Sequence, residues 1–241
     1  QILHIDYQNL EVGPGEELKA TVTANLDMIN FKFLDLDYKN LSYGQDDPDL
    51  SFYTMADLYI DSDHKIIKEA AQKVIGSEQR PVVIMEKLYY YVTDIMDYDF
   101  KRADDPQYPL MYASEILQTG KGVCADYAVL YAALLRASGI PCRVASGIPL
   151  YTAILEGGYL EVGHAWVEVK FPQYGWVPID ITIEDFFMST DYNMNLATER
   201  GSGFLHRSTT MDWTSYYFDD FIYSWEGDDI PEVEQALIYR I

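Results

Sequence analysis

The sequence predicts a domain of mixed helices and strands, in which one buried helix is followed by a β-hairpin. Residues 124–137 are apolar on nearly every side, which is the pattern of a helix enclosed by its neighbours. Residues 164–170 and 176–180 have the character of two strands, and a short turn at 172–175 separates them. We therefore expect the chain to be organised around this helix and this hairpin.

The composition supports a folded domain and narrows the classes of partner. The chain has 241 residues, 49% of them hydrophobic, which is enough for a large core. Its 39 acidic and 17 basic residues give a net charge of −22. This balance argues against binding of nucleic acid, because a phosphate backbone is held by Lys and Arg. It suits a neutral or cationic partner and an extracellular or cell-surface location.

Two features bear on how the chain is targeted. No run of residues is long and apolar enough to predict a membrane-spanning segment. The chain begins at Gln1 without a signal peptide, so we expect a mature fragment or a piece of a longer protein.

The first sixty residues are expected to be rich in strands. Between residues 18 and 24, apolar and polar side chains alternate as in a half-buried strand. The alternation continues over residues 29–38 with a slip of one residue, which indicates a bulge or a change of partner strand. Residues 45–49 have the composition of a loop. We predict a β-rich appendage over residues 1–60, or the end of a β-sandwich, and a second domain over residues 61–241.

Helices are expected between this appendage and the central helix. Residues 61–63 are suited to cap a helix whose apolar face ends at Ile75, before Gly76. Pro81 suits the first turn of the next helix, and residues 113–117 are expected to form a short one. The acidic pairs at 61/63 and 97/99 do not complete the ligand spacing of a calcium loop. No metal site is therefore predicted.

Cys124 opens the central helix, and its position has chemical consequences. The free N–H groups and the positive dipole end of a helix N-terminus stabilise both a thiolate and an oxyanion. Gly120 and Gly122 would let a substrate backbone approach the sulfur. The alternative is a small buried hydrophobe in an inert domain. Cys142 begins the strand beyond the helix, about 20 Å or more away, so no disulfide is expected.

The hairpin brings a histidine and an aspartate into the same region. His164 and Trp166 lie on one face of the first strand, opposite its apolar side. In an even register, such as Trp166 opposite Asp180, the Asp180 carboxylate comes within reach of the His164 imidazole. An odd register would place the two side chains on opposite faces. The even register would give the thiolate, imidazolium and carboxylate set of an activated thiol.

Four sequence blocks carry a family resemblance. They are GVCADYA from Gly122, GIPCRVASG from Gly139, GHAWVEV from Gly163 and GWVPIDIT from Gly175. Together they resemble the bacterial transglutaminase-like domain, one of the papain-like thiol enzymes, over roughly residues 60–185. The chain departs from the family pattern only in reading Asp-Ile-Thr, where Asp-Pro-Thr is usual, from residue 180.

The resemblance implies an α+β fold, with the nucleophile helix packed on an antiparallel sheet. It also implies that Cys124, His164 and Asp180 are the catalytic triad. The expected activity is cysteine-dependent acyl transfer on a peptide or glutamine-type amide through an acyl-thioester, without a cofactor or metal. Water would make the protein a peptidase or amidase, and a lysine-like amine would make it a transglutaminase. We favour hydrolysis. The alternative is a non-catalytic module that binds protein or cell wall.

The substrate cleft is predicted in less detail. Gly122, Tyr151 and Trp166 are expected to line it, with a protein or peptide as the substrate. The Cys124 N–H is expected to be one oxyanion-hole donor. The candidates for the second, which lies upstream in the family, are Gln107, Tyr108 and Tyr112. Three further residues are expected to be structural: Asp126, Arg143 and Trp176.

Overall fold

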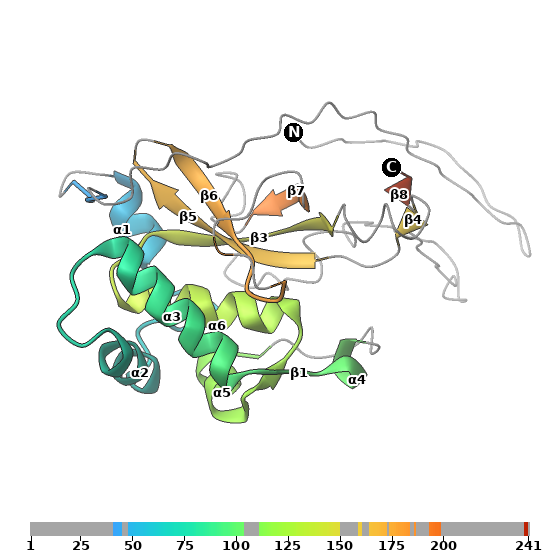
Figure 1. Cartoon of the computed structure of the whole chain (residues 1–241), viewed down its shortest axis with the longest axis horizontal. Helices are drawn as coiled ribbons and strands as arrows, with labels where there is room; N and C mark the ends of the chain where they lie inside the picture. Colours follow the sequence, from blue (N-terminus) through green and yellow to red (C-terminus); the bar gives the residue numbers. More distant parts are fainter. Residues whose placement is uncertain are drawn as a thin grey trace, which may run out of the picture.

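The computed structural model describes a core of helices and strands, drawn in colour in Figure 1. The predictions for residues 1–40, Gln107, Tyr108 and Tyr151 fall outside the described residues. Among those that are described, no helix is long and apolar enough to cross a membrane. The described residues are 41–44, 48–103, 111–149, 159–160, 164–172, 174–183, 186, 193–198 and 239–240.

A four-stranded antiparallel sheet forms one layer of this core. Its strands follow the order β6-β5-β3-β7. The predicted hairpin is confirmed as β5 and β6, and the predicted strand after the central helix as β3. The bounds are β3 Cys142–Pro149, β5 His164–Phe171, β6 Gly175–Ile179 and β7 Asn193–Thr198. A separate pair, β4 Tyr159–Leu160 and β8 Tyr239–Arg240, is antiparallel as well.

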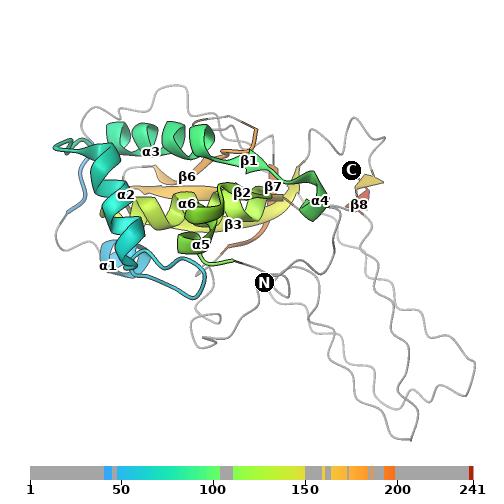
Figure 2. The same ribbon diagram turned by 90° about the horizontal axis from the view of Figure 1, so that it is seen from below.

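The central helix α6, Cys124–Ala137, lies between this sheet and the other helices (Figures 1 and 2). It packs against β3 and β5 on one side and against α2, α3 and α5 on the other. From Tyr127 to Leu135 its side chains are buried, as the apolar sequence predicts. The hydroxyl of the fully buried Tyr131 donates to the Met85 carbonyl at 3.0 Å, and that of Tyr127 donates to the Met96 carbonyl at 2.9 Å. The α+β class and the packing of the helix on the antiparallel sheet are confirmed.

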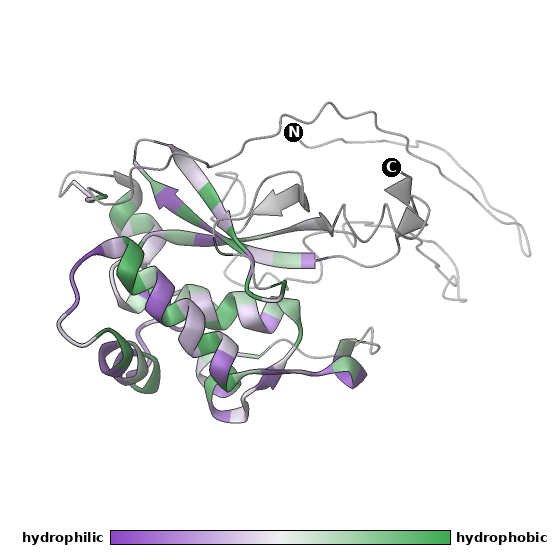
Figure 3. Cartoon of the chain, viewed as in Figure 1, coloured by the Kyte–Doolittle hydropathy of each residue, from purple (hydrophilic) through white to green (hydrophobic). Residues whose placement is uncertain are grey.

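Three predicted helices surround α6. They are α2 Lys65–Ile75, α3 Pro81–Ile95 and α5 Ala113–Thr119. Figure 3 shows hydrophilic and hydrophobic bands on α2 and α3, as expected of helices with one exposed side. The predicted cap of α2 is wrong in its residue, because His64 Nδ1, and not an aspartate, accepts from the Ile66 N–H at 3.4 Å. Asp61 instead accepts from the Ser114 N–H of α5 at 3.0 Å.

The residues just before the predicted boundary at 60 differ from expectation. Pro48–Thr54 forms a helix, α1, within the region that was expected to be rich in strands, with a loop at residues 45–49. A proline in the first helical turn explains this, since its fixed φ suits that position as well as a loop. Tyr53 of α1 packs edge-on against Trp176 of β6, with ring centroids 4.6 Å apart. Leu41 and Ile60 belong to the same hydrophobic core as α6, so described residues on both sides of the boundary share one core.

A short parallel pairing connects the end of α3 to the start of α6. It consists of the strands β1, Asp97–Tyr98, and β2, Lys121–Gly122. The Asp99 N–H donates to the Gly122 carbonyl at 2.9 Å. Figure 2 shows β1 and β2 beside α6, with the short helix α4, Phe100–Ala103, beyond them. This pairing holds residues 97–99 next to the segment that leads into Cys124.

Candidate active site

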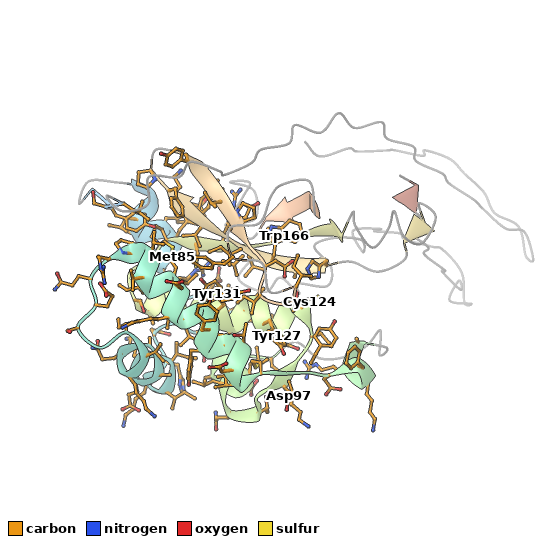
Figure 4. The ribbon with its side chains drawn as sticks, in the orientation of Figure 1. Met85, Asp97, Cys124, Tyr127, Tyr131 and Trp166 are labelled. Carbon is orange, nitrogen blue, oxygen red and sulfur yellow. The ribbon has the colours of Figure 1, made fainter. Side chains whose placement is uncertain are left out.

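Cys124 occupies the first residue of α6, as predicted, and its thiol is free and half-buried. Figure 4 shows it at the end of the helix, between Tyr127 on the helical layer and Trp166 on the sheet. Cys142 is also a free thiol, fully buried in the core. Of these two cysteines, Cys124 is thus the one placed to meet a substrate.

A buried carboxylate fixes the start of α6. Asp126, only 2% exposed, accepts a hydrogen bond from the Val123 N–H at 2.9 Å. Burial raises the pKa of Asp126, while the Val123 hydrogen bond and the charge of Arg102 oppose that rise. The Arg102 Nε lies 3.4 Å from the carboxylate. Asp126 is therefore the structural residue that the sequence predicted, and it orients the turn that carries Cys124.

Gly122 has a different role from the predicted one. A Cβ at this position would lie 2.4 Å from the Asp126 Cβ and 2.6 Å from its Oδ2. Such a contact is far inside van der Waals distance. The space beside Gly122 is filled by Asp126, so this glycine admits the carboxylate rather than a substrate backbone.

The β5–β6 hairpin has the even register that places His164 and Asp180 together. Val167 pairs with Ile179, and one further step of this register puts Trp166 opposite Asp180. The His164 Nε2 and Asp180 Oδ2 atoms are 2.5 Å apart. Asp180 is fully buried, and its other oxygen accepts from the Thr182 N–H at 3.0 Å and hydroxyl at 2.8 Å. The carboxylate is thereby held in one orientation toward the imidazole.

The charge state of His164 follows from its two neighbours. Burial lowers the pKa of His164, but hydrogen bonds to Asp180 and Cys124 and their negative charges outweigh this and raise it to about 10. The imidazole is then protonated at neutral pH. Because Nε2 faces Asp180, Nδ1 is the nitrogen left for the Cys124 sulfur. The structure thus brings together all three residues of the predicted triad, with the imidazolium between thiol and carboxylate.

Trp166 does not line a cleft as predicted. It is 2% exposed, and its ring stacks on His164 with centroids 6.1 Å apart and an interplanar angle of 29°. A side chain so deeply buried offers almost no surface to a substrate. Its ring instead packs against the His164 imidazole and helps to hold it in place.

Sequence reasoning missed two residues in this part of the molecule. Thr182 holds Asp180, as described above, and its place in the Asp-Ile-Thr block was the available signal. Tyr98 lies on β1 directly across from Gly122 and is 38% exposed. Burial and the nearby charge of Cys124 raise the pKa of Tyr98 to about 12. Nothing in the local sequence marks Tyr98, because only the β1–β2 pairing brings it there.

The remaining residues that the sequence analysis named make packing and ion-pair contacts. The Arg143 guanidinium lies 2.7 Å from Glu168 and 4.1 Å from the centre of the Trp176 ring, as expected of a structural pair. Tyr112, a candidate oxyanion donor, begins α5 and packs its ring against Tyr59 at 5.5 Å. Within the described part of the chain, no cluster of three His, Cys, Asp or Glu side chains is arranged for a metal ion.

Comparison with known proteins finds a family to which this region is similar. Residues 68–181, just under half of the chain, match the family model of the transglutaminase-like superfamily. A protein-glutamine gamma-glutamyltransferase of Pseudomonas aeruginosa is 41% identical over 73 residues, which is 29% of this chain and 11% of the relative. An uncharacterized protein of Haemophilus influenzae is 28% identical over 198 residues, which is 74% of this chain and 50% of that protein.

A solved structure agrees with the fold. It is a protein of Cytophaga hutchinsonii designated a candidate cysteine protease, with 21% identity and a TM-score of 0.50 over 64% of this chain and 48% of that one. The matches span from about a tenth to a half of the length of the curated relatives. Residues 68–181, which match the model of the transglutaminase-like superfamily, include all three residues of the predicted triad.

Proposed function

We propose that this chain is a thiol enzyme that cleaves a peptide or glutamine-type amide through an acyl-thioester on Cys124. The observation that carries the proposal is the placement of His164 between the buried Asp180 carboxylate and the Cys124 thiol. An imidazolium in this position stabilises the thiolate and has a proton to give. The substrate class is a protein or peptide, and no cofactor or metal takes part.

In the proposed reaction each residue of the triad has its own role. The Cys124 sulfur attacks the amide carbonyl, and the resulting oxyanion faces the N–H groups at the start of α6. The carbon–nitrogen bond then breaks as His164 donates its proton to the leaving amine or ammonia. Asp180 keeps the imidazole oriented and compensates its charge. In the second half, His164 takes a proton from the nucleophile that attacks the thioester.

We favour water as that nucleophile, since water needs no dedicated site whereas an amine acceptor has to be held beside the thioester. Transamidation is the second candidate. It is favoured by the name of the Pseudomonas aeruginosa relative and by the net charge of −22, which attracts cationic amines. The same acidic balance underlies our proposal of an extracellular or cell-surface location.

The two outcomes are separated by following both products from one blocked glutamine dipeptide. Ammonia released without an added amine marks hydrolysis, and incorporation of a fluorescent alkylamine marks transamidation. Cys124→Ala is the control and should form neither product. If wild type forms neither product from a panel of peptide amides, and Cys124 reacts as an ordinary thiol, the non-catalytic protein- or wall-binding module becomes the better account.

A further inference from the structure

Arg102 links the short helix α4 to two other segments of the chain. It follows β1 closely, and its backbone N–H donates to the Asp99 carbonyl at 3.1 Å and to the Asp99 Oδ1 at 3.2 Å. Its Nη1 lies 3.3 Å from the sulfur of Met111, which precedes α5. Figure 2 shows α4 at the end of the molecule where α6 begins. The Arg102 side chain is thus fixed by its neighbours.

The second segment that Arg102 contacts is the first turn of α6. Its Nε lies 3.4 Å from the Asp126 Oδ2, and the two side chains are only 17% and 2% exposed. The same Asp126 oxygen accepts the hydrogen bond from the Val123 N–H at 2.9 Å. A buried carboxylate needs a cation or hydrogen bonds to compensate for its lost hydration. Asp126 therefore caps the backbone before Cys124 as one partner of a buried ion pair.

A carboxylate at this position has opposite effects on the helix and on the nucleophile. It suits the positive dipole end of α6. Asp126 is also only two residues from Cys124, and a negative charge close to a thiol disfavours the thiolate. Burial and the charge of Asp99 raise the pKa of Asp126, while the Val123 hydrogen bond and the Arg102 charge lower it. Arg102 thus supplies positive charge where the carboxylate would otherwise oppose the thiolate.

We propose that Arg102 is a positioning residue of the nucleophile that acts by neutralising Asp126, an assignment that rests on the proposed acyl-transfer function of Cys124. With the ion pair in place, Asp126 can hold the Val123 N–H without putting a net negative charge beside the sulfur. The peptide that leads into Cys124 is then fixed, and the stabilisation of the thiolate by His164 is not opposed. This role requires no contact between Arg102 and the substrate.

The backbone around this ion pair is anchored as well. The Asp99 N–H donates to the Gly122 carbonyl at 2.9 Å, and the space beside Gly122 is filled by the Asp126 side chain. The β1–α4 segment and the start of α6 are therefore joined at two points, one through the backbone and one through Arg102. Partners that are already fixed lose little side-chain entropy on pairing, in contrast to those of an exposed pair.

The test reads the charge at the Cys124 sulfur with two alkylating reagents. Iodoacetate is an anion and iodoacetamide is neutral, and both react with the thiolate by the same displacement. The ratio of their rates therefore reports the local charge, whatever the fraction of thiolate. In Arg102→Met we expect the ratio of iodoacetate to iodoacetamide to fall by roughly 3- to 10-fold at low salt, because Asp126 then repels the anion. In Asp126→Asn, whose amide oxygen still accepts from the Val123 N–H, the ratio should rise by a similar factor.

Two further variants are the controls. Arg102→Met combined with Asp126→Asn removes both charges, and the ratio should return to within about twofold of wild type. Lys101→Met removes an exposed cation from the same helix and should leave the ratio within about twofold, since solvent and salt screen an exposed charge. Rates are compared among variants whose circular dichroism matches that of wild type, and Arg102→Gln replaces Arg102→Met if the latter does not fold.

Three results would overturn the assignment, and they are distinguishable. If both single variants keep the wild-type ratio, the charges of this pair do not act on the sulfur, while the proposed function stands. If both reagents slow in equal proportion in Arg102→Met, Arg102 supports the fold and not the charge at the nucleophile. If wild-type Cys124 reacts with iodoacetamide no faster than a cysteine in an unfolded peptide, the proposed function fails, and this inference fails with it.

Discussion

Two acid–base pairs bridge neighbouring strands of the same sheet, and they have different consequences. His164–Asp180 links β5 to the end of β6 at 2.5 Å, and Arg143–Glu168 links β3 to β5 at 2.7 Å. Both are largely buried. The Arg143 guanidinium lies over the Trp176 ring. His164 has a second ring nitrogen, which the thiol at the start of α6 approaches.

The two pairs therefore differ in what the Arg143 and His164 side chains meet besides their carboxylate partners. A guanidinium between a carboxylate and an aromatic ring is a clamp, because it neither exchanges a proton nor meets a nucleophile. An imidazolium between a carboxylate and a thiol is able to do both. Electrostatic pairing alone does not make a reactive site, and the comparison gives a set of substitutions that separate chemistry from stability.

The largest effect is expected from Asp180→Asn. The amide preserves the shape of the side chain but removes the negative charge that stabilises the His164 imidazolium. We expect the rate of amide cleavage to fall by roughly 10³- to 10⁴-fold, with the folded structure retained in far-UV circular dichroism. A variant that keeps most of its activity would contradict the proposed role of this carboxylate.

The next effect concerns the pH dependence of His164. Its pKa is raised above the ordinary value of 6.5 to about 10, so the protonated form persists through neutral and mildly alkaline pH. Amide cleavage needs that proton for the leaving amine and should fall about tenfold per pH unit above pH 10. The imidazole ¹⁵N shifts, measured by NMR, should show both nitrogens protonated at pH 8. A neutral imidazole at pH 8 would contradict the ion-pair arrangement.

The raised pKa also has a consequence for folding. A proton held more tightly in the folded state stabilises the fold fully below pH 6.5, and this stabilisation is lost as pH rises through about 10. In the Cys124→Ala background, Asp180 alone is left to raise the pKa of His164. The free energy of unfolding should therefore decline as the pH rises above 6.5, over a narrower range than in wild type. Replacing His164 by Gln in that background should remove most of the slope.

Gly122→Ala tests how the helix start is fixed. The added methyl would meet Asp126 at 2.4 Å, so the first turn of α6 has to shift. We expect a loss of about 1–3 kcal/mol in the free energy of unfolding, together with slower alkylation of Cys124. Gly44→Ala is the matched control, because a Cβ there meets nothing within 4 Å. Equal stability of the two variants in urea denaturation would contradict the packing described for Gly122.

The smallest effect on the chemistry is expected from Arg143→Met. It removes the clamp while keeping an apolar side chain beside Trp176. We expect the free energy of unfolding to fall by about 1–3 kcal/mol, because the Glu168 carboxylate loses its partner, and Cys124 alkylation to stay close to the wild-type rate. A large loss of thiol reactivity in this variant would mean that the two pairs are coupled.

The sequence predicted the parts of this site that depend on local pattern. The apolar helix after Cys124 and the alternation of the hairpin strands were sufficient to expect both elements. The alternation of side chains along the two strands allowed His164 and Asp180 to lie on the same face in an even register or on opposite faces in an odd one. The structure has the even register. These features succeed because helix and strand periodicities are carried by residues close in sequence.

The parts that failed depend on contacts between distant segments. Tyr98 is brought across from Gly122 only by the β1–β2 pairing, which has no sequence pattern of its own. Gly122 suggested that a substrate backbone could approach the Cys124 sulfur. The sequence alone does not tell which side chain fills the space beside a glycine. Trp166 suggested a cleft wall, although the alternation of a strand does not distinguish a solvent-exposed face from a second buried one.

The most direct test of the account is the rate at which iodoacetamide labels Cys124 at pH 6, read by mass spectrometry alongside Cys142, in wild type and in His164→Ala. An imidazolium-stabilised thiolate predicts fast labelling of Cys124 and a loss of that rate without His164, while the buried Cys142 stays slow in both. If Cys124 labels no faster than an ordinary thiol and His164→Ala changes nothing, the three residues do not form an activated nucleophile.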